Sequence, residues 1–378
     1  MKITYLSSST IPSRTANSIH VMKMCQAFAK NGHEVVLIAP DKKNGLEQGV
    51  EDVYDFYGVD KCFKIIKIPH PSIRGKRFIY GYLAARKAKK NQSHIVYGRN
   101  SIACAFAARM GLTTIFESHL PIPAEESFFD RLFKTKPWKV DLAGIVVITR
   151  ALKDYYATHY PWMKDRIRVV PDAADPPSCS PVKETNPYGS KNRLQVGYAG
   201  NLYRGKAMEI ISDLARQCPW ACFHVIGGTE ADKAFWQERL GSLDNIIFLG
   251  FLPPGEVAGT LMHMDVLLAP FQAKVLSHGS NQTDIGAWFS PLKIFEYMSV
   301  GRPIVCSDLP VLREVLAHEK NALLCSPDDA SAWTHALMRL RDEEALRKRL
   351  AQTAYFEFLE QYTWSARAKK VIEAIGSR

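Results

Sequence analysis

Short apolar runs alternate with amphipathic segments along the whole chain. The runs in the first half predict buried strands, and several intervening segments carry apolar residues at helical spacing. In segment 19–30 the apolar residues recur with the helical period, and Asn31-Gly32 ends the predicted helix. The strands predicted in this half are 2–6, 34–39, 65–68, 94–97, 113–117, 145–149 and 168–171.

A proline-rich polar stretch, DAADPPSCSPVKETNPYGSK at 172–191, interrupts this alternation and predicts an interdomain linker. A second series of strands follows at 194–199, 222–226, 246–249, 265–269, 303–306 and 322–325. The segment 343–378 is predicted to be helical throughout. Alternating strands and helices imply parallel sheets covered on both faces, so we expect an α/β chain of two Rossmann-like domains with a cleft between them. The expected first domain is 1–175, the linker 176–191 and the second domain 192–360.

Composition narrows the class of protein. The chain has 378 residues, of which 47% are hydrophobic, and this excludes a disordered chain. Its longest apolar runs fall far short of the roughly 18–20 residues that a membrane span needs. Eight cysteines without a Cys-x-x-Cys pair are typical of a reduced, cytosolic protein, and the start of the chain shows no signal peptide. We therefore expect a soluble cytoplasmic protein.

The net charge of +11 is unevenly distributed. Residues 1–175 hold 27 Lys and Arg against 16 Asp and Glu, so they carry the entire excess, and the rest of the chain is neutral. A strongly basic half indicates a partner with phosphates or an anionic surface. Nucleic acid, membrane lipid and a phosphorylated substrate are all compatible with the charge alone.

The stretch that begins at Ser290 predicts an anion site. Ser290 is a good N-cap residue, and Pro291 stands where proline is favoured in the first helical turn. The free amides of Leu292 and Lys293, the helix dipole and the Lys293 ammonium would together attract an anion. Glu296 lies further inside the helix, where its carboxylate could accept bonds from vicinal hydroxyls. These local features are equally consistent with an ordinary surface helix that has an N-cap and binds no anion.

The full stretch, SPLKIFEYMSVGRPIVCSDLP, closely resembles the nucleotide-binding helix of glycosyltransferase family 4, retaining enzymes of the GT-B fold. Further matching stretches follow in the expected order at 9–20, 116–119, 198–206, 225–228, 248–253 and 265–270. The resemblance implies the GT-B architecture, two Rossmann-like domains facing across a deep cleft. It also implies a C-terminal helix, 361–378, that contains Trp364 and crosses back to the first domain.

The resemblance also implies roles for individual residues. Lys206 aligns with the lysine that neutralises the leaving diphosphate, and preorganised cations at such a position stabilise the transition state. Arg204 stands nearby as a second cation or, alternatively, as a solvated loop arginine. His119 aligns with a histidine that touches the donor sugar, although a lone histidine after a strand is ordinarily structural. Glu296 aligns with the glutamate that bonds the ribose hydroxyls.

The remaining predicted site residues form two groups. The donor-binding group adds Gly200, Asn201, Gly227, Gly228, Phe251, Leu252, Ser290, Pro291, Leu292 and Lys293. The group on the acceptor or sugar side comprises a loop at Ala16, Asn17 and Ser18, together with Arg99 and Asp284; Arg99 could instead bridge to a neighbouring carboxylate.

Three positions depart from the family pattern. Trp288 stands where the first glutamate of the Glu-x7-Glu motif belongs, Asn201 stands where a basic partner of Lys206 belongs, and the turn at 16–18 lacks its glycine pair. No metal or other cofactor is expected. The acidic pair Asp328-Asp329 precedes a predicted helix and is read as its cap.

Two basic segments, 74–90 and 128–139, mix aromatic residues with Lys and Arg. They suit an interface with anionic lipid headgroups, although a helix packed on its own sheet with a solvated charged rim explains the first equally well. No nucleic-acid-binding motif is present. We predict peripheral binding at the inner face of the cell membrane.

These observations predict a retaining, metal-independent hexosyltransferase. It would use a UDP- or GDP-sugar donor and a glycan or lipid-linked acceptor, in polysaccharide or glycolipid biosynthesis. Same-face attack assisted by the leaving phosphate is preferred to a covalent intermediate, because no nucleophile is evident. A nucleotide-sugar epimerase of similar fold and a non-catalytic nucleotide-sugar-binding relative are the alternatives.

Overall fold

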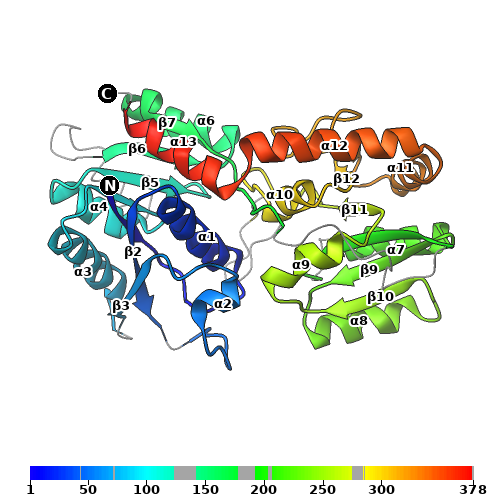
Figure 1. Ribbon diagram of the computed structural model, residues 1–378, viewed down its shortest axis with the longest axis horizontal. Helices are drawn as coiled ribbons and strands as arrows, with labels where there is room; N and C mark the ends of the chain where they lie inside the picture. Colours follow the sequence, from blue (N-terminus) through cyan, green and yellow to red (C-terminus); the bar gives the residue numbers. More distant parts are fainter. Residues whose placement is uncertain are drawn as a thin grey trace. The chain divides into compact units, whose positions relative to one another are not determined.

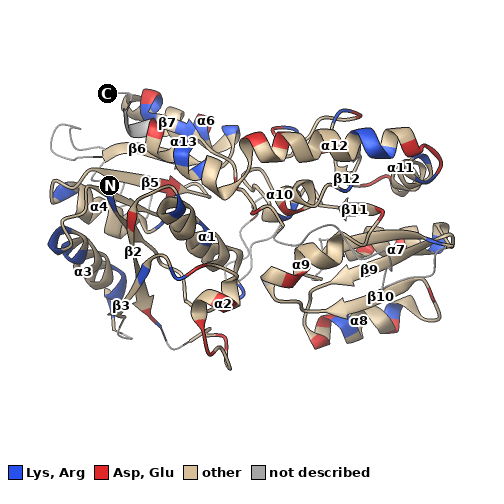
Figure 2. Ribbon diagram, in the orientation of Figure 1, with Lys and Arg blue, Asp and Glu red and all other residues tan. Residues whose placement is uncertain are grey.

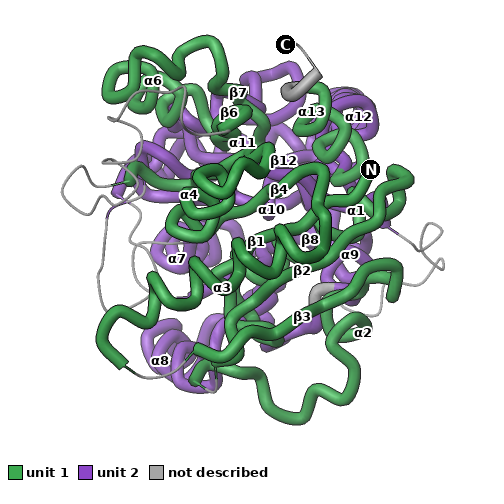
Figure 3. Tube along the Cα trace, turned by 90° about the vertical axis from the view of Figure 1, so that its left-hand side faces the viewer, with its two compact units in different colours: residues 1–171, 364–378 green, residues 172–363 purple. Residues whose placement is uncertain are grey.

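The computed structural model describes residues 1–42, 44–70, 73–122, 142–177, 192–202, 207–274, 284 and 286–376. The chain divides into two compact units, coloured separately in Figure 3. Unit 1 comprises residues 1–171 and 364–378, and unit 2 comprises residues 172–363. Each unit contains one parallel sheet, so the predicted α/β class is confirmed.

Unit 1 has a seven-stranded sheet in the order β3-β2-β1-β4-β5-β6-β7 (Figure 1). Its inner strands are buried on both faces, which is typical of a parallel sheet covered by helices. The strands are β1 (Lys2–Leu6), β2 (Glu34–Asp41), β3 (Lys64–Pro69), β4 (Ile95–Gly98), β5 (Thr114–Ser118), β6 (Leu142–Val147) and β7 (Ile167–Val169). The helices are α1 (Ala16–Lys30), α2 (Val53–Tyr57), α3 (Lys76–Lys90), α4 (Ser101–Arg109), α6 (Arg150–His159), the 3₁₀ helix η3 (Pro161–Arg166) and α13 (Trp364–Gly376).

Unit 2 has a six-stranded sheet in the order β10-β9-β8-β11-β12-β13. Its strands are β8 (Leu194–Ala199), β9 (Ala221–Ile226), β10 (Ile246–Gly250), β11 (Val266–Ala269), β12 (Ile304–Ser307) and β13 (Leu323–Cys325). Its helices are α7 (Met208–Gln217), α8 (Glu230–Leu240), α9 (Pro254–Leu261), α10 (Leu292–Ser299), α11 (Ala330–Asp342) and α12 (Glu344–Gln361). In both sheets the strand order reverses beside the first strand of the unit, so the carboxyl ends of the central strands are where a ligand is expected.

Most strand predictions are correct to within one or two residues, and β1 and β8 match in full. The exception is β6, which begins three residues before the predicted 145–149 and ends at Val147. The strand stops early because Thr149 caps the next helix, with its hydroxyl accepting the Leu152 N–H at 3.3 Å. The predicted cap at Asp329 is confirmed, since its carboxylate accepts the N–H groups of Ser331 and Ala332.

The prediction of one continuous helix over 343–378 is wrong. The segment forms two helices, α12 and α13, which are separated by Tyr362 and Thr363. Thr363 forms a parallel bridge with Ala174, so its backbone leaves the helical path, and Trp364 begins α13. The break separates the units, because α12 belongs to unit 2 and α13 packs against α1 in unit 1.

Within the described ranges, no helix is both long enough and apolar enough to cross a membrane. Of the predicted linker 176–191, only Pro176 and Pro177 are described, and residues 178–191 lie outside the described ranges.

Candidate active site

In unit 2, two glycine turns meet at the carboxyl ends of β8 and β9. Gly200 follows β8, and its N–H donates to the Ile226 carbonyl at the end of β9, at 2.9 Å. Gly227 comes next, with a φ of 108°, and a Cβ there would collide with the carbonyl oxygen of Gly200. Only glycine allows the two turns to pack this closely, and together with Gly228 they leave bare backbone at this edge.

The ammonium of Lys293 lies at the Gly200 turn. Its Nζ is 3.9 Å from the centre of the Tyr198 ring and 5.2 Å from that of Phe271. A Cβ on Gly200 would lie only 2.7 Å from this Nζ. Cation–π attraction therefore holds a positive charge directly beside the bare backbone, an arrangement suited to an anion. Four of the predicted donor-binding residues are thus brought together: Gly200, Gly227, Gly228 and Lys293.

The start of α10 differs from the prediction. Pro291 is the N-cap and Leu292 is the first helical residue, so the prediction of Ser290 as N-cap is wrong by one position. The reason is that the Ser290 hydroxyl is used elsewhere, accepting the Asp172 N–H at 3.2 Å. Among the described residues, no side chain caps the start of α10.

Glu296 lies one turn after Lys293 and is half-buried like it, so the two side chains share one face of α10. The next residue, Tyr297, is fully buried, and its hydroxyl accepts the Ala199 N–H at 2.8 Å. This hydrogen bond holds α10 against the end of β8. It thereby fixes the positions of Lys293 and Glu296 relative to the glycine turns.

The other residues predicted in unit 2 are more exposed. Phe251 follows β10 and is 38% exposed, while Leu252 is half-buried against the apolar core. Asn201 is exposed, and its backbone carbonyl accepts the Tyr198 hydroxyl at 2.9 Å. Asp284 is exposed and accepts the Gly286 N–H at 2.9 Å.

The remaining predictions concern Trp288, the two basic residues of the loop after Gly200, and the second basic segment. Trp288, at the position of the missing glutamate, is half-buried. Arg204 and Lys206 lie outside the described residues, as does the basic segment 128–139. Their predicted roles therefore remain predictions.

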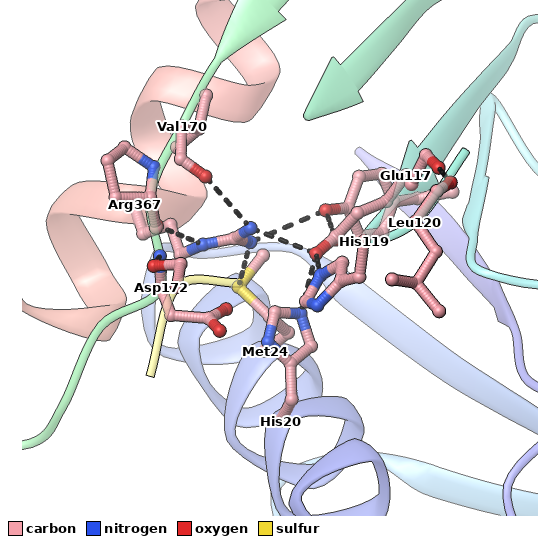
Figure 4. A network of polar contacts seen from close by, with 12 residues as sticks. His20, Met24, Glu117, His119, Leu120, Val170, Asp172 and Arg367 are labelled. Carbon is pink, nitrogen blue, oxygen red and sulfur yellow. Dashed lines mark hydrogen bonds and ion pairs between the residues drawn. The ribbon is translucent and has the colours of Figure 1, made fainter. Parts of the chain in front are cut away.

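In unit 1, the carboxyl end of β5 carries a buried carboxylate. Glu117 is 1% exposed and receives three cationic or imidazole partners, shown in Figure 4. Its Oε1 lies 2.9 Å from both the Arg367 guanidinium and the His20 Nε2, and the His119 Nε2 also contacts it. The hydroxyl of Tyr97 donates to its Oε2.

Arg367 comes from α13 and is itself 1% exposed. Its Nε donates to the Pro171 carbonyl at 2.8 Å, and its Nη2 donates to the Val170 carbonyl at 3.3 Å as well as to Glu117. A buried guanidinium needs this many acceptors, because each unsatisfied N–H would be strongly unfavourable away from water.

The charge state of Glu117 follows from these partners. Burial by itself raises the pKa of its carboxyl, but the positive charge of Arg367, then His20, and the hydrogen bond from His119 lower it by more. The resulting pKa lies well below the usual glutamate range. Glu117 is therefore ionised in the folded protein and acts as a fixed negative charge that orients both imidazoles.

His119 is the outermost member of this network. Its side chain is 16% exposed, against 1% for His20, and the two rings meet edge to face with centroids 4.9 Å apart. With Nε2 directed at Glu117, the ring is held in one orientation. His20 and Glu117 carry atoms suited to metal ligation. However, the Arg367 guanidinium already occupies the Glu117 carboxylate, which favours an ion-pair network over a metal centre.

Of the residues in this network, only His119 was among the predicted site residues. Glu117 and Arg367 were not predicted, and His20 appeared only as the last residue of the stretch 9–20. A usable signal was present at Glu117. A carboxylate near the end of a buried strand requires a buried cationic partner. The identity of that partner was not readable, since Arg367 lies 250 positions further along the chain.

The predicted loop at Ala16, Asn17 and Ser18 is instead the first turn of α1, with Thr15 as N-cap. The Ser18 hydroxyl is buried and donates to the Ser13 carbonyl at 2.7 Å. The Asn17 Oδ1 is buried without a hydrogen-bond partner among the described residues.

Arg99 follows β4 directly. Its N–H donates to the Leu6 carbonyl at the end of β1, at 3.1 Å. The arginine therefore lies at the same sheet edge as Glu117.

Two family models match this chain, and between them they cover most of both units. The model described as Glycosyltransferase Family 4 matches residues 18–176, and the model described as Glycosyl transferases group 1 matches residues 193–343. The chain belongs to glycosyltransferase family 4. The two matched regions contain the His20–Glu117–His119 cluster and the Lys293 site, respectively.

Several relatives and one solved structure illustrate the family likeness. The chain is 29% identical over 148 residues to a phosphatidyl-myo-inositol mannosyltransferase of Mycobacterium leprae, covering 39% of this chain and 36% of that protein. It is 24% identical over 216 residues to a 2-deoxystreptamine glucosyltransferase of Streptomyces kanamyceticus, covering 54% and 52%. These matches thus span from about a third to about half of the relatives' lengths.

The solved structure is that of Anabaena HepE in complex with UDP and glucose. It superposes with a TM-score of 0.70 over 100% of both chains, at 14% identity. At this level of identity the likeness concerns the fold, and the predicted GT-B fold is confirmed.

Proposed function

We propose that this protein is a retaining glycosyltransferase that transfers a hexose from a UDP- or GDP-sugar to a hydroxyl of a glycan or lipid-linked acceptor. The observation that carries the proposal is the Lys293 ammonium, held over Tyr198 beside the bare backbone of the Gly200 turn. A diphosphate needs both features: backbone that it can approach closely and a placed positive charge.

The chemistry follows from where charge develops. As the bond to the anomeric carbon breaks, negative charge grows on the departing diphosphate, so a preorganised cation stabilises the transition state more than the ground state. Lys293 supplies such a cation. Glu296, on the same face of α10, would accept bonds from the ribose hydroxyls.

Lys206, Arg204 and His119 retain the roles implied by the family resemblance. In this proposal the two basic residues add to the charge that faces the leaving diphosphate, and His119 contacts the donor sugar. Attack from the same face, assisted by the leaving phosphate, would retain the anomeric configuration, and no metal ion is invoked.

Relatives support the donor and acceptor classes. The Anabaena structure is described with UDP and glucose, which supports a uridine nucleotide sugar as donor. The M. leprae relative is described as acting on phosphatidyl-myo-inositol, which supports a lipid-linked acceptor and glycolipid or polysaccharide assembly.

The proposal is tested by a thermal-shift panel of UDP, GDP and their sugars, followed by donor turnover with and without candidate acceptors. A ligand that binds the folded state raises the melting temperature, so the panel identifies the base. Turnover that requires an acceptor supports a transferase. Conversion of the donor without acceptor into a sugar epimer would identify an epimerase, and binding without any turnover would identify a non-catalytic relative; either result contradicts the proposal.

The membrane part of the proposal rests on α3. The helix packs inward through small residues and Tyr80, while Phe78, Ile79 and Tyr82 are 44%, 40% and 44% exposed. Several Lys and Arg positions, blue in Figure 2, lie along the same helix. Apolar side chains exposed among cations are suited to an anionic bilayer surface, where each lysine contributes about 1 kcal/mol.

Vesicle flotation tests this surface. Vesicles of phosphatidylcholine with phosphatidylglycerol should bind the full-length protein, and the double variant K89A/K90A should bind them roughly 30-fold more weakly. The matched control is K348A/K369A, which removes two exposed lysines elsewhere. Equal binding by both double variants, or no binding by the wild type at low salt, would contradict a membrane role for α3.

A further inference from the structure

We propose that unit 1 contains a binding site for a phosphate ester at the carboxyl ends of β1, β2 and β3, formed by Lys42, His70, Lys76 and Arg77. The inference deepens the proposed function, since it gives the acceptor a phosphate group, and it rests on that function only for the identity of the ligand. The site itself is argued from the residues that converge there.

Strand register brings the first two residues together. β2 and β3 pair in parallel with Pro40 opposite Ile68 and Asp41 opposite Pro69. Lys42 directly follows β2, and His70 directly follows β3. The two residues therefore lie side by side where the backbone leaves the sheet. Parallel neighbours lie about 4.8 Å apart, which is close enough for one oxyanion to contact both side chains.

Lys42 is held at this edge by a single neutral acceptor. Its Nζ donates to the Ser8 carbonyl, just beyond β1, at 2.8 Å, and the residue is half-buried. Burial is the first cause that lowers the pKa of Lys42, and the positive charges of Lys76 and Arg77 lower it further. A partly buried ammonium that is repelled by two other cations is unfavourable, and a bound anion would stabilise it.

His70 is affected by the same positive charges. Its ring lies edge-on to Tyr80, 5.9 Å between centroids, and the Tyr80 hydroxyl donates to the carbonyls of Ser7, just after β1, and Ile38, within β2. Burial, and then the charge of Lys42, lowers the pKa of His70, with smaller contributions from Lys76 and Arg77. The four residues are therefore electrostatically one cluster.

Lys76 and Arg77 occupy an unfavourable place in α3. They form its first turn, where the positive end of the helix dipole disfavours cations, and that turn has neither an acidic residue nor a side-chain cap. Among the described residues, no acid forms an ion pair with any of the four cluster members; Asp41, the nearest in sequence, is exposed. A bound dianion would satisfy the helix end and all four side chains together.

A separate observation comes from the loop after β1. The Ser9 hydroxyl is buried, with the residue 4% exposed, and its Oγ has no hydrogen-bond partner within the described part of the chain. It follows Ser8, the residue whose carbonyl holds Lys42. A buried hydroxyl left without a partner is uncommon, and a phosphate oxygen is an acceptor that would satisfy it.

The ligand class follows from the charges. Three permanent cations and a histidine suit a phosphate monoester or a diphosphate, which carry about two negative charges near neutral pH. Such a group could belong to a lipid headgroup or to a soluble phosphorylated acceptor, and the chemistry at the site would be the same.

The experiment is a titration of full-length protein, labelled with ¹³C at the histidine Cε1 positions, with inorganic phosphate and with glycerol 3-phosphate at constant ionic strength. The His70 resonance is assigned from the variant H70Q. We expect both probes to shift this resonance, and we expect the pKa of His70 to rise with saturation. In K76A/R77A the dissociation constant should increase at least ~10-fold, whereas K348A/K369A, which loses the same charge from exposed positions outside α3, should match the wild type.

A second arm identifies the source of the phosphate. Vesicles of phosphatidylcholine with phosphatidic acid are compared with soluble glycerol 3-phosphate, and K42M repeats the loss of binding outside α3. Saturation by the soluble ester supports the site and a soluble acceptor, and saturation by the vesicles alone supports the site and a lipid headgroup. The proposal is overturned if no probe shifts His70, or if the two double variants weaken binding equally, which would indicate bulk charge. These measurements use no sugar donor, so a failed transferase assay leaves their outcome unaffected.

Discussion

The two units place different kinds of groups at the same edge of similar sheets. In unit 1 the carboxyl ends of the strands hold buried charges, with Glu117 and Arg367 almost without solvent exposure. In unit 2 the corresponding edge is formed by bare glycine backbone and one lysine over an aromatic ring.

This difference shows that similar sheets can support opposite electrostatic designs. Unit 1 fixes its side chains through an ion-pair network that is satisfied internally and that carries one partly exposed imidazole, His119. Unit 2 leaves its polar backbone open to a ligand and supplies the complementary charge from Lys293. The charges around Glu117 are neutralised by partners within the protein, whereas the Lys293 ammonium and the open backbone of unit 2 are complemented by the ligand that binds there. Each of the predictions below removes one element of this contrast.

The largest effect is expected for Glu117→Gln. The substitution retains the shape of the side chain but leaves the buried Arg367 guanidinium without its counter-charge, so the unfolding free energy should fall by about 3–5 kcal/mol. Urea unfolding at pH 7 measures this. The matched control, Glu34→Gln, removes the partner of Lys2 in an exposed pair and should change stability by less than about 1 kcal/mol. Similar losses in the two variants would show that the buried network contributes no more than a surface pair.

In unit 2 the strongest effect is expected for Gly227→Ala. The new Cβ would collide with the Gly200 carbonyl, and alanine is strained at a φ of 108°, so the turn should be destabilised by about 1–3 kcal/mol. The thermal shift produced by UDP should also shrink. Gly259→Ala is the control, because a Cβ there meets nothing within 4 Å and α9 tolerates alanine. An unchanged response to UDP in Gly227→Ala would refute the role of the glycine turns.

Lys293→Gln should separate binding from folding. The side chain is half-buried and its ammonium lies over ring faces, so stability should change by less than about 1 kcal/mol, while UDP affinity should fall ~10–100-fold. Isothermal titration calorimetry with UDP measures this directly. Lys233→Gln, which removes an exposed lysine paired with Glu230, should bind UDP like the wild type. A dissociation constant for Lys293→Gln that equals the control's would remove Lys293 from the site.

The smallest effect is a pH dependence confined to unit 1. The pKa of Glu117 is lower in the folded protein than in the unfolded chain, so its contribution is complete above about pH 4.5 and is lost as the pH falls through the folded value. The stability difference between the wild type and Glu117→Gln should therefore narrow below about pH 4.5, by at most about 1.4 kcal/mol per pH unit. Urea unfolding of both proteins from pH 7 to pH 3.5 tests this, and a constant difference would show that folding does not lower the pKa of Glu117.

Much of the fold could be predicted from the sequence, because buried parallel strands such as β1 and β8 form unbroken apolar runs. The failure at 343–378 has a physical cause. Helical periodicity continues through Tyr362 and Thr363, and only the pairing of Thr363 with Ala174 ends α12. A contact between residues this far apart leaves no local signal.

The site was predictable to the extent that its residues lie in local motifs. Gly200 and Gly227 were predicted because their stretches resemble the glycine turns of the family, and Lys293 was predicted because it follows a helix-start signature. The Ser290 cap was misplaced by one residue because its hydroxyl bonds to Asp172, and Arg367 was missed because it acts on a carboxylate 250 positions away. Residues that meet only in the tertiary structure cannot be predicted from local sequence patterns.

The separation between Glu117 and Arg367 also affects how the protein is made. The ribosome releases the strands of unit 1 first, yet the guanidinium that neutralises Glu117 follows only after all of unit 2 has been synthesised. Domains generally begin to fold as they emerge, at about 5–20 residues per second. Nascent unit 1 must therefore wait on the order of 10 s or more without the guanidinium partner of Glu117. Its final consolidation is coupled to completion of the chain, and it is during this interval that we expect chaperone binding.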